Sequence, residues 1–323
     1  MRPAPALRQQ TRLPIIGAPM FLVSGPELVA AQCGAGIIGT FPSLNARPQE
    51  QLHEWITRIE TRLTAIRRAA PGARVAPYGV NLIVHPSNAR WQGDLAICAE
   101  RQVPLLITSL HPPETVVRTA HAYGGQVYHD VTTVRHAKRA LDAGVDGLIL
   151  VAAGAGGHAG QLNPIALVNE IRAFYDGPLA LSGCISHGKD ILAAEALGCD
   201  FAYMGTRFIA TKESLANETY REMVLSAQAA DVLYTPYFSG VPANYLTPSI
   251  QAAGLNPEDI KDQIKSQAPP PNLDKSTRPT PWKDIWSAGQ GVGSSQEVLA
   301  VEDLVALLEA EYREAKRALL RNG

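Results

Sequence analysis

The sequence has little cysteine and no long apolar run. Its four cysteines are scattered, and no pair of them has the close spacing of a metal-binding motif. Such thiols do not form a disulfide framework in a long chain, so we expect them to be reduced and the protein to be cytoplasmic. No stretch of about 18 apolar residues occurs, which predicts that no helix crosses a membrane. Residues 1–12 contain charges and prolines but no apolar core, so we do not expect a secretion signal there.

An excess of charge of either sign is also missing. Lysine and arginine number 29, aspartate and glutamate number 30, and the net charge is −1. Nucleic-acid-binding proteins are typically basic, so no nucleic-acid partner is expected. The sequence has no P-loop, no Gly-x-Ser-x-Gly elbow and no Gly-x-Gly-x-x-Gly pattern after a first strand, and its histidines and cysteines lack metal-ligand spacing. We therefore expect no metal site.

The sequence does contain an alternation of short apolar runs with longer amphipathic segments. Near-continuous apolar runs are typical of parallel strands covered by helices. The expected strands span residues 13–20, 36–41, 78–84, 104–110, 126–131, 147–153, 178–185 and 201–209, and the helical patterns between them span 26–33, 48–69, 88–102, 113–123, 134–143, 163–175 and 188–197. This alternation predicts an α/β protein with a closed (β/α)8 TIM barrel, with an open doubly wound sheet as the alternative.

The alternation breaks after the last expected strand. Residues 214–229 are expected to be helical, and residues 298–321 have the periodicity of a closing helix. Between them, residues 231–281 are interrupted by prolines, and we expect short helices and a loop that cover the barrel mouth. The expected organisation is thus a barrel of residues 1–230 and 282–323 with a lid-like insertion at 231–281.

Two of the expected strand ends have the residues of a phosphate site. The run 178–185 carries Ser-Gly-Cys at 182–184, and the run 201–209 carries Met-Gly-Thr at 204–206. Glycine lets backbone N–H groups approach a ligand closely, and the last two strands of such barrels commonly bind phosphate. Each glycine alone could equally serve only to turn the chain, but the pair at these two strands favours phosphate.

A glycine-rich loop follows the expected strand at 147–153. It reads Gly-Ala-Gly-Gly-His-Ala-Gly at residues 154–160, which we call the histidine loop, and it brings His158 to the carboxyl end of the barrel. A histidine titrates near neutral pH and can accept a proton from a substrate. An isolated loop histidine is more often structural. The position of His158 at the carboxyl end of the barrel, where barrel enzymes carry their catalytic groups, favours a catalytic role instead. His129, beside Asp130 in the run 126–131, is the competing candidate.

In this order the motifs resemble the nitronate monooxygenase family. They are Gly-Ala-Pro-Met at 17–20, Gly-Val-Asn-Leu at 79–82, Gly-Gly-His-Ala-Gly at 156–160, Ser-Gly-Cys-Ile at 182–185, Met-Gly-Thr-Arg-Phe at 204–208 and Trp-Ser-Ala-Gly-Gln-Gly at 286–291. The resemblance implies an FMN-dependent enzyme that oxidises alkyl nitronates, nitroalkanes or propionate 3-nitronate with O2 to a carbonyl compound and nitrite. One departure is Cys184, which stands where many relatives have glycine and must adopt a backbone angle that cysteine tolerates.

The resemblance also assigns roles to single residues. His158 would abstract the α-proton of a nitroalkane or stabilise the anionic nitronate. Tyr245 would either contact the substrate or pack in the lid. The residues expected at the FMN are Ala18, Pro19 and Met20 along the flavin, Asn81 at the flavin ring, Gly160 and Gln161 after the histidine, Ser182, Gly183, Gly205 and Thr206 at the phosphate, and also Asp130, Cys184 and Met204.

Two other functions remain open at this point. Related flavin barrels share the glycine–histidine loop, so the same fold with FMN could serve an NAD(P)H:quinone reductase or an enoyl-reductase-like enzyme. A flavin-free phosphate-binding barrel, either a lyase or a binding protein, is the third hypothesis. The expected partners are a small-molecule substrate and O2; the identity of the physiological substrate and a homodimeric state are left open.

Overall fold

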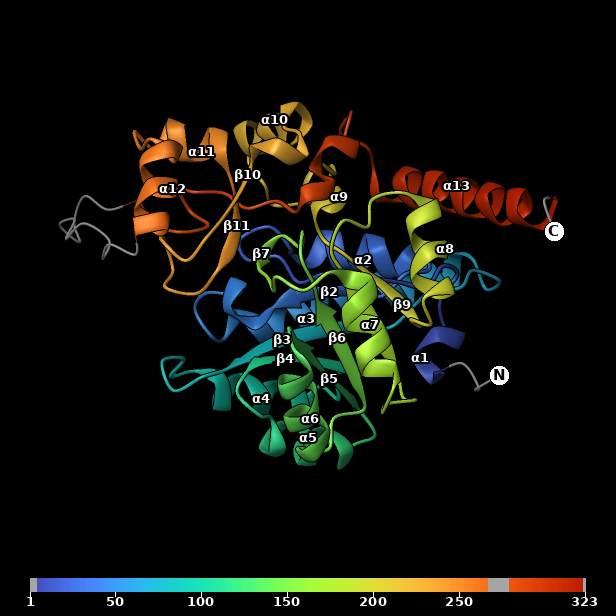
Figure 1. The fold of residues 1–323 in the computed structure, drawn as a ribbon. Helices are drawn as coiled ribbons and strands as arrows, with labels where there is room; N and C mark the ends of the chain where they lie inside the picture. Colours follow the sequence, from blue (N-terminus) through green and yellow to red (C-terminus); the bar gives the residue numbers. More distant parts are fainter. Residues whose placement is uncertain (1–4, 267–278, 322–323) are drawn as a thin grey trace.

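The computed structural model describes residues 5–266 and 279–321, and its centre is a barrel of parallel strands (Figure 1). Eight strands form one sheet in the order β1-β9-β8-β6-β5-β4-β3-β2. They are β1 (Ile15–Gly17), β2 (Gly39–Pro42), β3 (Tyr78–Val84), β4 (Leu105–Leu110), β5 (Gln126–Val131), β6 (Gly147–Val151), β8 (Leu179–Ser182) and β9 (Phe201–Met204). A parallel bridge between Ile16 and Ile38 joins the two outer strands of this order. The predicted (β/α)8 barrel is confirmed, and the open sheet is excluded.

Helices surround the barrel. Three of them begin at a side chain that accepts a hydrogen bond from the first helical turn, namely Thr133, Asn163 and Asn217. The helices outside the insertion are α1 (Ala6–Gln9), α2 (Pro26–Gly34), α3 (Gln51–Ala69), α4 (Trp91–Glu100), α5 (Glu114–His121), α6 (Val134–Asp142), α7 (Pro164–Arg172), α8 (Gly188–Ala196), α9 (Thr206–Ile209), α10 (Glu218–Ser226) and α13 (Val301–Arg321), with short 3-10 turns η1 (Ser43–Asn45), η2 (Ala229–Asp231) and η3 (Gln290–Ser294). In the described part of the chain, no helix is both long and apolar enough to cross a membrane.

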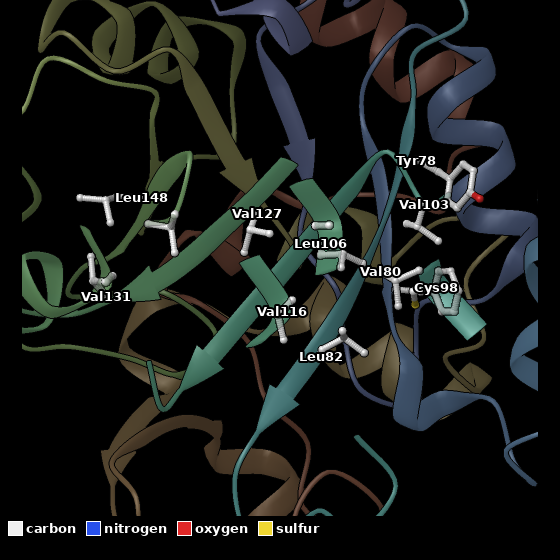
Figure 2. Close-up of a cluster of buried hydrophobic side chains, with 14 of the residues drawn as sticks. Tyr78, Val80, Leu82, Cys98, Val103, Leu106, Val116, Val127, Val131 and Leu148 are labelled. Atoms are coloured by element: carbon white, nitrogen blue, oxygen red, sulfur yellow. The ribbon is translucent and has the colours of Figure 1, made fainter. Parts of the chain in front are cut away.

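Side chains alternate between the two faces of the barrel wall, as the pleat of a strand requires. Outward-facing residues such as Val80, Leu106 and Val127 pack under the helices in the largest core (Figure 2). Inward-facing residues such as Ile107 and Tyr128 fill the barrel itself. Towards the carboxyl ends of the strands the inward positions become polar, and this change provides the site described below. These positions are Asn81, Ser109, Asp130, Ser182 and Tyr203.

The eighth barrel strand is shorter than predicted. The apolar run at 201–209 was expected to be one strand, but β9 ends at Met204 and the following residues form the short helix α9. Phe208 of α9 is buried with Leu304 and Leu308 of α13. The prediction was wrong because a short apolar run has no periodicity that separates a strand from a buried helical turn.

The predicted insertion contains strands as well as the expected short helices. β10 (Val232–Thr235) and β11 (Ala243–Leu246) form an antiparallel pair, and α11 (Thr247–Ala252) and α12 (Pro257–Ser266) follow. The histidine loop contributes a two-residue strand, β7 (Gly157–His158), to the same sheet. The expectation of helices and a loop alone was therefore incomplete. Residues 267–278 of the insertion lie outside the described residues.

Candidate functional site

A small pocket lies at the carboxyl ends of β8 and β9. It is lined by residues 154–156 of the histidine loop, by residues 182–186 after β8, by Tyr203 and residues 205–206 of β9 and its turn, and by Gly289 and Gly291. We call residues 182–186 the β8 loop. Thus Ser182, Gly183, Gly205 and Thr206, which were predicted to hold a phosphate, line one pocket.

Backbone atoms of three segments meet at this pocket because the segments carry glycine there. A Cβ atom on Gly156 would lie 2.9 Å from the backbone nitrogen of Gly289, and one on Gly183 would lie 2.7 Å from the carbonyl oxygen of Ala153. The Gly289 N–H donates a 2.9 Å hydrogen bond to Thr206 Oγ1. A pocket walled by backbone in this way suits an anion, since N–H groups can approach it without steric hindrance.

Cys184 keeps the glycine-like backbone that its position demands. Its φ angle is +59°, in the left-handed region that costs a non-glycine residue about 1–2 kcal/mol. Its Sγ lies 3.9 Å from Gln290 Oε1. Burial and the nearby Asp190 raise the pKa of the thiol, so Cys184 stays neutral and adds no negative charge beside an anion.

A second group of polar side chains lies inside the barrel, at the ends of β3, β4 and β5. Asn81 Nδ2 donates to Ser109 Oγ at 3.3 Å, and Ser109 Oγ donates to Asp130 Oδ2 at 2.6 Å. The other carboxyl oxygen of Asp130 is buried and has no hydrogen-bond partner in the described structure. Burial raises the pKa of Asp130 to about 7. This carboxyl group can therefore offer either an acceptor or a protonated donor to a ligand in the barrel mouth.

His129, the competing candidate base, is not part of this site. Its side chain faces outward from β5, is 5% exposed, and lies 2.8 Å from Thr108 Oγ1 through Nδ1. Burial lowers its pKa to about 4, as expected for a neutral core histidine. Met204 also faces outward, into the core with Leu13 and Ile15, so the expectation that its side chain touches the cofactor has no support from its position.

The loop after β1 approaches the same pocket. The Ala18 N–H donates to the carbonyl oxygen of Met204, and a Cβ on Gly205 would lie 3.4 Å from Ala18 Cβ and 3.5 Å from Met20 Sδ. Pro19, between Ala18 and Met20 in the sequence, is half-buried. The predicted stretch Gly-Ala-Pro-Met thus borders the β9 turn, where its atoms can contact a bound ligand.

The histidine loop is tied to the insertion rather than free. β7 pairs with β11, Asn244 Nδ2 donates to the Ala155 carbonyl at 2.6 Å, and Tyr234 Oη donates to the Ala159 carbonyl at 2.9 Å. At the end of the loop, the Gly160 N–H donates to the carbonyl oxygen of Val151, and the Gln161 side chain interacts with Tyr234. The insertion therefore sets the position of this loop.

The imidazole of His158 contacts one aromatic ring and one hydroxyl, and the residue is exposed. Trp282 packs edge-on with a centroid distance of 5.0 Å, and Ser239 Oγ lies 3.2 Å from Nε2. Desolvation lowers the pKa of His158. Tyr245 is fully buried, packs against Phe238 and Trp282, and donates to Ser239 Oγ at 3.2 Å. Of the two roles left open for Tyr245, packing in the insertion is the one that its burial favours.

Several residues of the site were missed by the sequence reasoning. Gly289 and Gly291 were noticed only as part of a family motif, because glycines at this spacing could equally serve only to turn the chain. The segment 239–246 was expected on the substrate side, but the contact of Ser239 with His158 was not, and Trp282 carries no local signal; only the folded structure brings both to His158. Among the described residues no group of three histidine, cysteine, aspartate or glutamate side chains could hold a metal ion.

A larger cavity of about 600 Å³ lies at the opposite, amino end of the strands. It is lined among others by Tyr78, Pro104 and Gln126, which begin β3, precede β4 and begin β5. Reactive groups of barrel enzymes are placed at the carboxyl ends, so we assign the candidate site to the smaller pocket and its surroundings.

Comparison with known proteins identifies relatives of the whole barrel. The sequence model of the family described as "Nitronate monooxygenase" matches residues 6–311. Nitronate monooxygenase of Pseudomonas aeruginosa is 30% identical over 279 residues, which cover 72% of this chain and 76% of that protein. An indene-carboxyl-CoA dehydrogenase of Rhodococcus jostii is 27% identical over 233 residues, 72% of this chain, and the match spans 62% of that longer protein.

Two solved structures are also similar over almost the full length. FabK from Thermotoga maritima superposes with a TM-score of 0.77 at 25% identity and covers 98% of this chain and 97% of its own. Nitroalkane oxidase from Streptomyces ansochromogenes has a TM-score of 0.77 at 25% identity and covers 98% of this chain and 100% of its own.

Proposed function

The chain belongs to the nitronate monooxygenase family, and we propose that it oxidises alkyl nitronates with O2 to a carbonyl compound and nitrite. Nitroalkanes and propionate 3-nitronate belong to the proposed substrate class. The observation that carries the proposal is the glycine-walled pocket at the carboxyl ends of β8 and β9, which is lined by residues 154–156 of the same loop that carries His158. The similarity to nitroalkane oxidase supports the same chemistry.

We propose FMN as the cofactor. Ser182, Gly183, Gly205 and Thr206 would hold its phosphate, and the backbone-walled pocket that they line fits such a group. Asn81 and Asp130 would bind the flavin ring, and the buried carboxyl oxygen without a partner supports a polar ligand at this place. When bound, a flavin supplies the electron transfer between substrate and O2, while the protein supplies orientation, a base and electrostatics. Ala18, Pro19, Met20, Gly160 and Gln161 would lie along the ring.

His158 is the proposed general base. Because its pKa lies below the ordinary value, its ring is neutral at neutral pH and can accept the α-proton of a nitroalkane. The imidazolium that results would stabilise the negative charge of the nitronate beside it. A nitronate that arrives already deprotonated needs no base.

We further propose that residues 231–281 act as the lid of this site. The lid would exclude water from the substrate and position the histidine loop, with which it shares a sheet. Water exclusion strengthens the electrostatic interactions inside the site.

A reductase that takes electrons from NADH or NADPH is the second candidate, and the similarity to FabK is the observation that favours it. The two are separated by mixing the yellow protein anaerobically with NADH, NADPH or an alkyl nitronate and recording flavin absorbance. We expect bleaching by the nitronate alone. Rapid bleaching by a nicotinamide, without bleaching by the nitronate, would establish the reductase instead. Protein that stays colourless after incubation with FMN would establish a flavin-free barrel.

A further inference from the structure

The hydroxyl of Ser239 is the hydrogen-bonding centre of the lid next to His158. Its Oγ lies 2.9 Å from the carbonyl oxygen of Val241, 3.2 Å from Tyr245 Oη and 3.2 Å from His158 Nε2. The backbone N–H of Val241 approaches the same oxygen at 3.4 Å. Ser239 is half-buried, and it belongs to the turn between β10 and β11.

The donors and acceptors around this hydroxyl can be assigned. A carbonyl oxygen only accepts, so the single hydroxyl hydrogen of Ser239 points to Val241, its nearest contact. Burial raises the pKa of Tyr245, whose phenol therefore stays protonated and donates to Ser239. With its one hydrogen committed, Ser239 Oγ can only accept, and its two lone pairs take the two side-chain donors Tyr245 Oη–H and His158 Nε2–H, since the Val241 N–H at 3.4 Å is the longest of the four contacts. The proton of the neutral imidazole is therefore on Nε2.

We propose that Ser239 is the positioning residue of the candidate base: it holds His158 as the Nε2–H tautomer and leaves Nδ1 as the atom that accepts the substrate proton. Within the described residues, Nδ1 has no hydrogen-bond partner. The role assigned to Nδ1 rests on the proposed function, whereas the tautomer itself does not. An orienting partner on the second ring nitrogen is a common way to fix which nitrogen of a histidine is basic.

The surroundings of the ring explain why a single hydroxyl suffices. β7 and β11 fix the backbone of His158 through their pairing, with Ala243 opposite His158. The edge-on contact with Trp282 restricts the tilt of the imidazole. What remains is the 180° rotation that exchanges the two ring nitrogens, and only a hydrogen bond distinguishes those two orientations.

The tautomer is measured by nitrogen NMR on flavin-loaded protein that carries ¹⁵N-labelled histidine, with the His158 signals assigned by His158→Asn. At a pH above the titration of His158, we expect a protonated Nε2 and an unprotonated Nδ1 in the wild type. Ser239→Ala should show averaged signals for the two nitrogens, and Ser239→Thr, which keeps the hydroxyl, should restore the wild-type pattern. A proton on Nδ1 in the wild type, or an unchanged spectrum in Ser239→Ala, overturns the proposal.

Kinetics supply the second measurement. Ser239→Ala should lower kcat/KM for a neutral nitroalkane about fivefold relative to that for the preformed nitronate, the size of one net hydrogen bond. Ser239→Thr should keep the wild-type ratio. Ser87→Ala is the matched control, because it removes another serine–histidine hydrogen bond, that of Ser87 with His85 at 2.7 Å, and should also keep the ratio. An unchanged ratio in Ser239→Ala overturns the positioning role. If the wild type turns over neither substrate, the proposed function fails, and the NMR result still decides the tautomer.

Discussion

Replacing Gly154 with alanine would test the contact between the histidine loop and the β8 loop. Gly154 has φ +82°, and a Cβ atom there would lie 2.3 Å from Cys184 Sγ and 3.0 Å from Gln290 Oε1. Two effects lower the free energy of unfolding: alanine in a left-handed backbone costs about 1–2 kcal/mol, and the forced contact costs about 1–3 kcal/mol. A third effect offsets about 0.4–1 kcal/mol of this loss, because alanine restricts the unfolded chain more than glycine does. We expect Gly154→Ala to lower the free energy of unfolding by about 2–4 kcal/mol in urea titrations followed by circular dichroism.

Gly157→Ala is the matched control for this prediction. Gly157 has φ +69° in the same loop, but a Cβ atom there meets no described atom within 4 Å, so only the backbone cost remains, about 1 kcal/mol after the offset. Adding Cys184→Gly to Gly154→Ala removes the clashing sulfur and should recover most of the difference between the two single variants. Equal losses for Gly154→Ala and Gly157→Ala, or no recovery in the double variant, would refute the contact.

Three further variants test the assignments of titrating groups. His158→Asn should keep the flavin absorbance but lose turnover of neutral nitroalkanes; near wild-type nitroalkane turnover would exclude His158 as the base. The pKa of Asp130 is about 7 in the folded protein and 3.8 ordinarily. The free energy of unfolding should therefore fall as pH rises through this interval, and Asp130→Asn should abolish that fall in urea titrations. The pKa of His129 is about 4 against 6.5 ordinarily, so stability should fall as pH drops through that interval, a loss that His129→Asn should flatten.

Much of the barrel is predictable because its strands are buried on both faces. A near-continuous apolar run such as 147–153, which is followed by a glycine-rich loop and lies between two helical patterns, favours a buried strand, and β6 occupies Gly147–Val151 of it. The short helix after β9 and the hairpin of β10 and β11 were harder to predict. Their apolar stretches are about four residues long, which is too short for a period to be read.

The candidate site was likewise predictable only in part. Ser182 and Thr206 were predicted together because the carboxyl ends of parallel strands meet at one edge. Ser239 and Trp282 could not be predicted from position, since Ser239 comes from the insertion and Trp282 directly follows it, and both contact His158 only in the folded arrangement in which β11 pairs with β7. Long-range contacts of this kind leave no mark on the local sequence.

The choice between His129 and His158 could have been made from the sequence. Side chains of a strand alternate between its faces, so His129 must share a face with Val127 and Val131, two apolar residues typical of the layer under the helices. Asp130 then faces the barrel interior, as it does in the structure, where His129 bonds Thr108 instead. A histidine flanked at i−2 and i+2 by valine on a barrel strand is therefore a core residue. A histidine beyond the end of a barrel strand, such as His158, escapes this constraint.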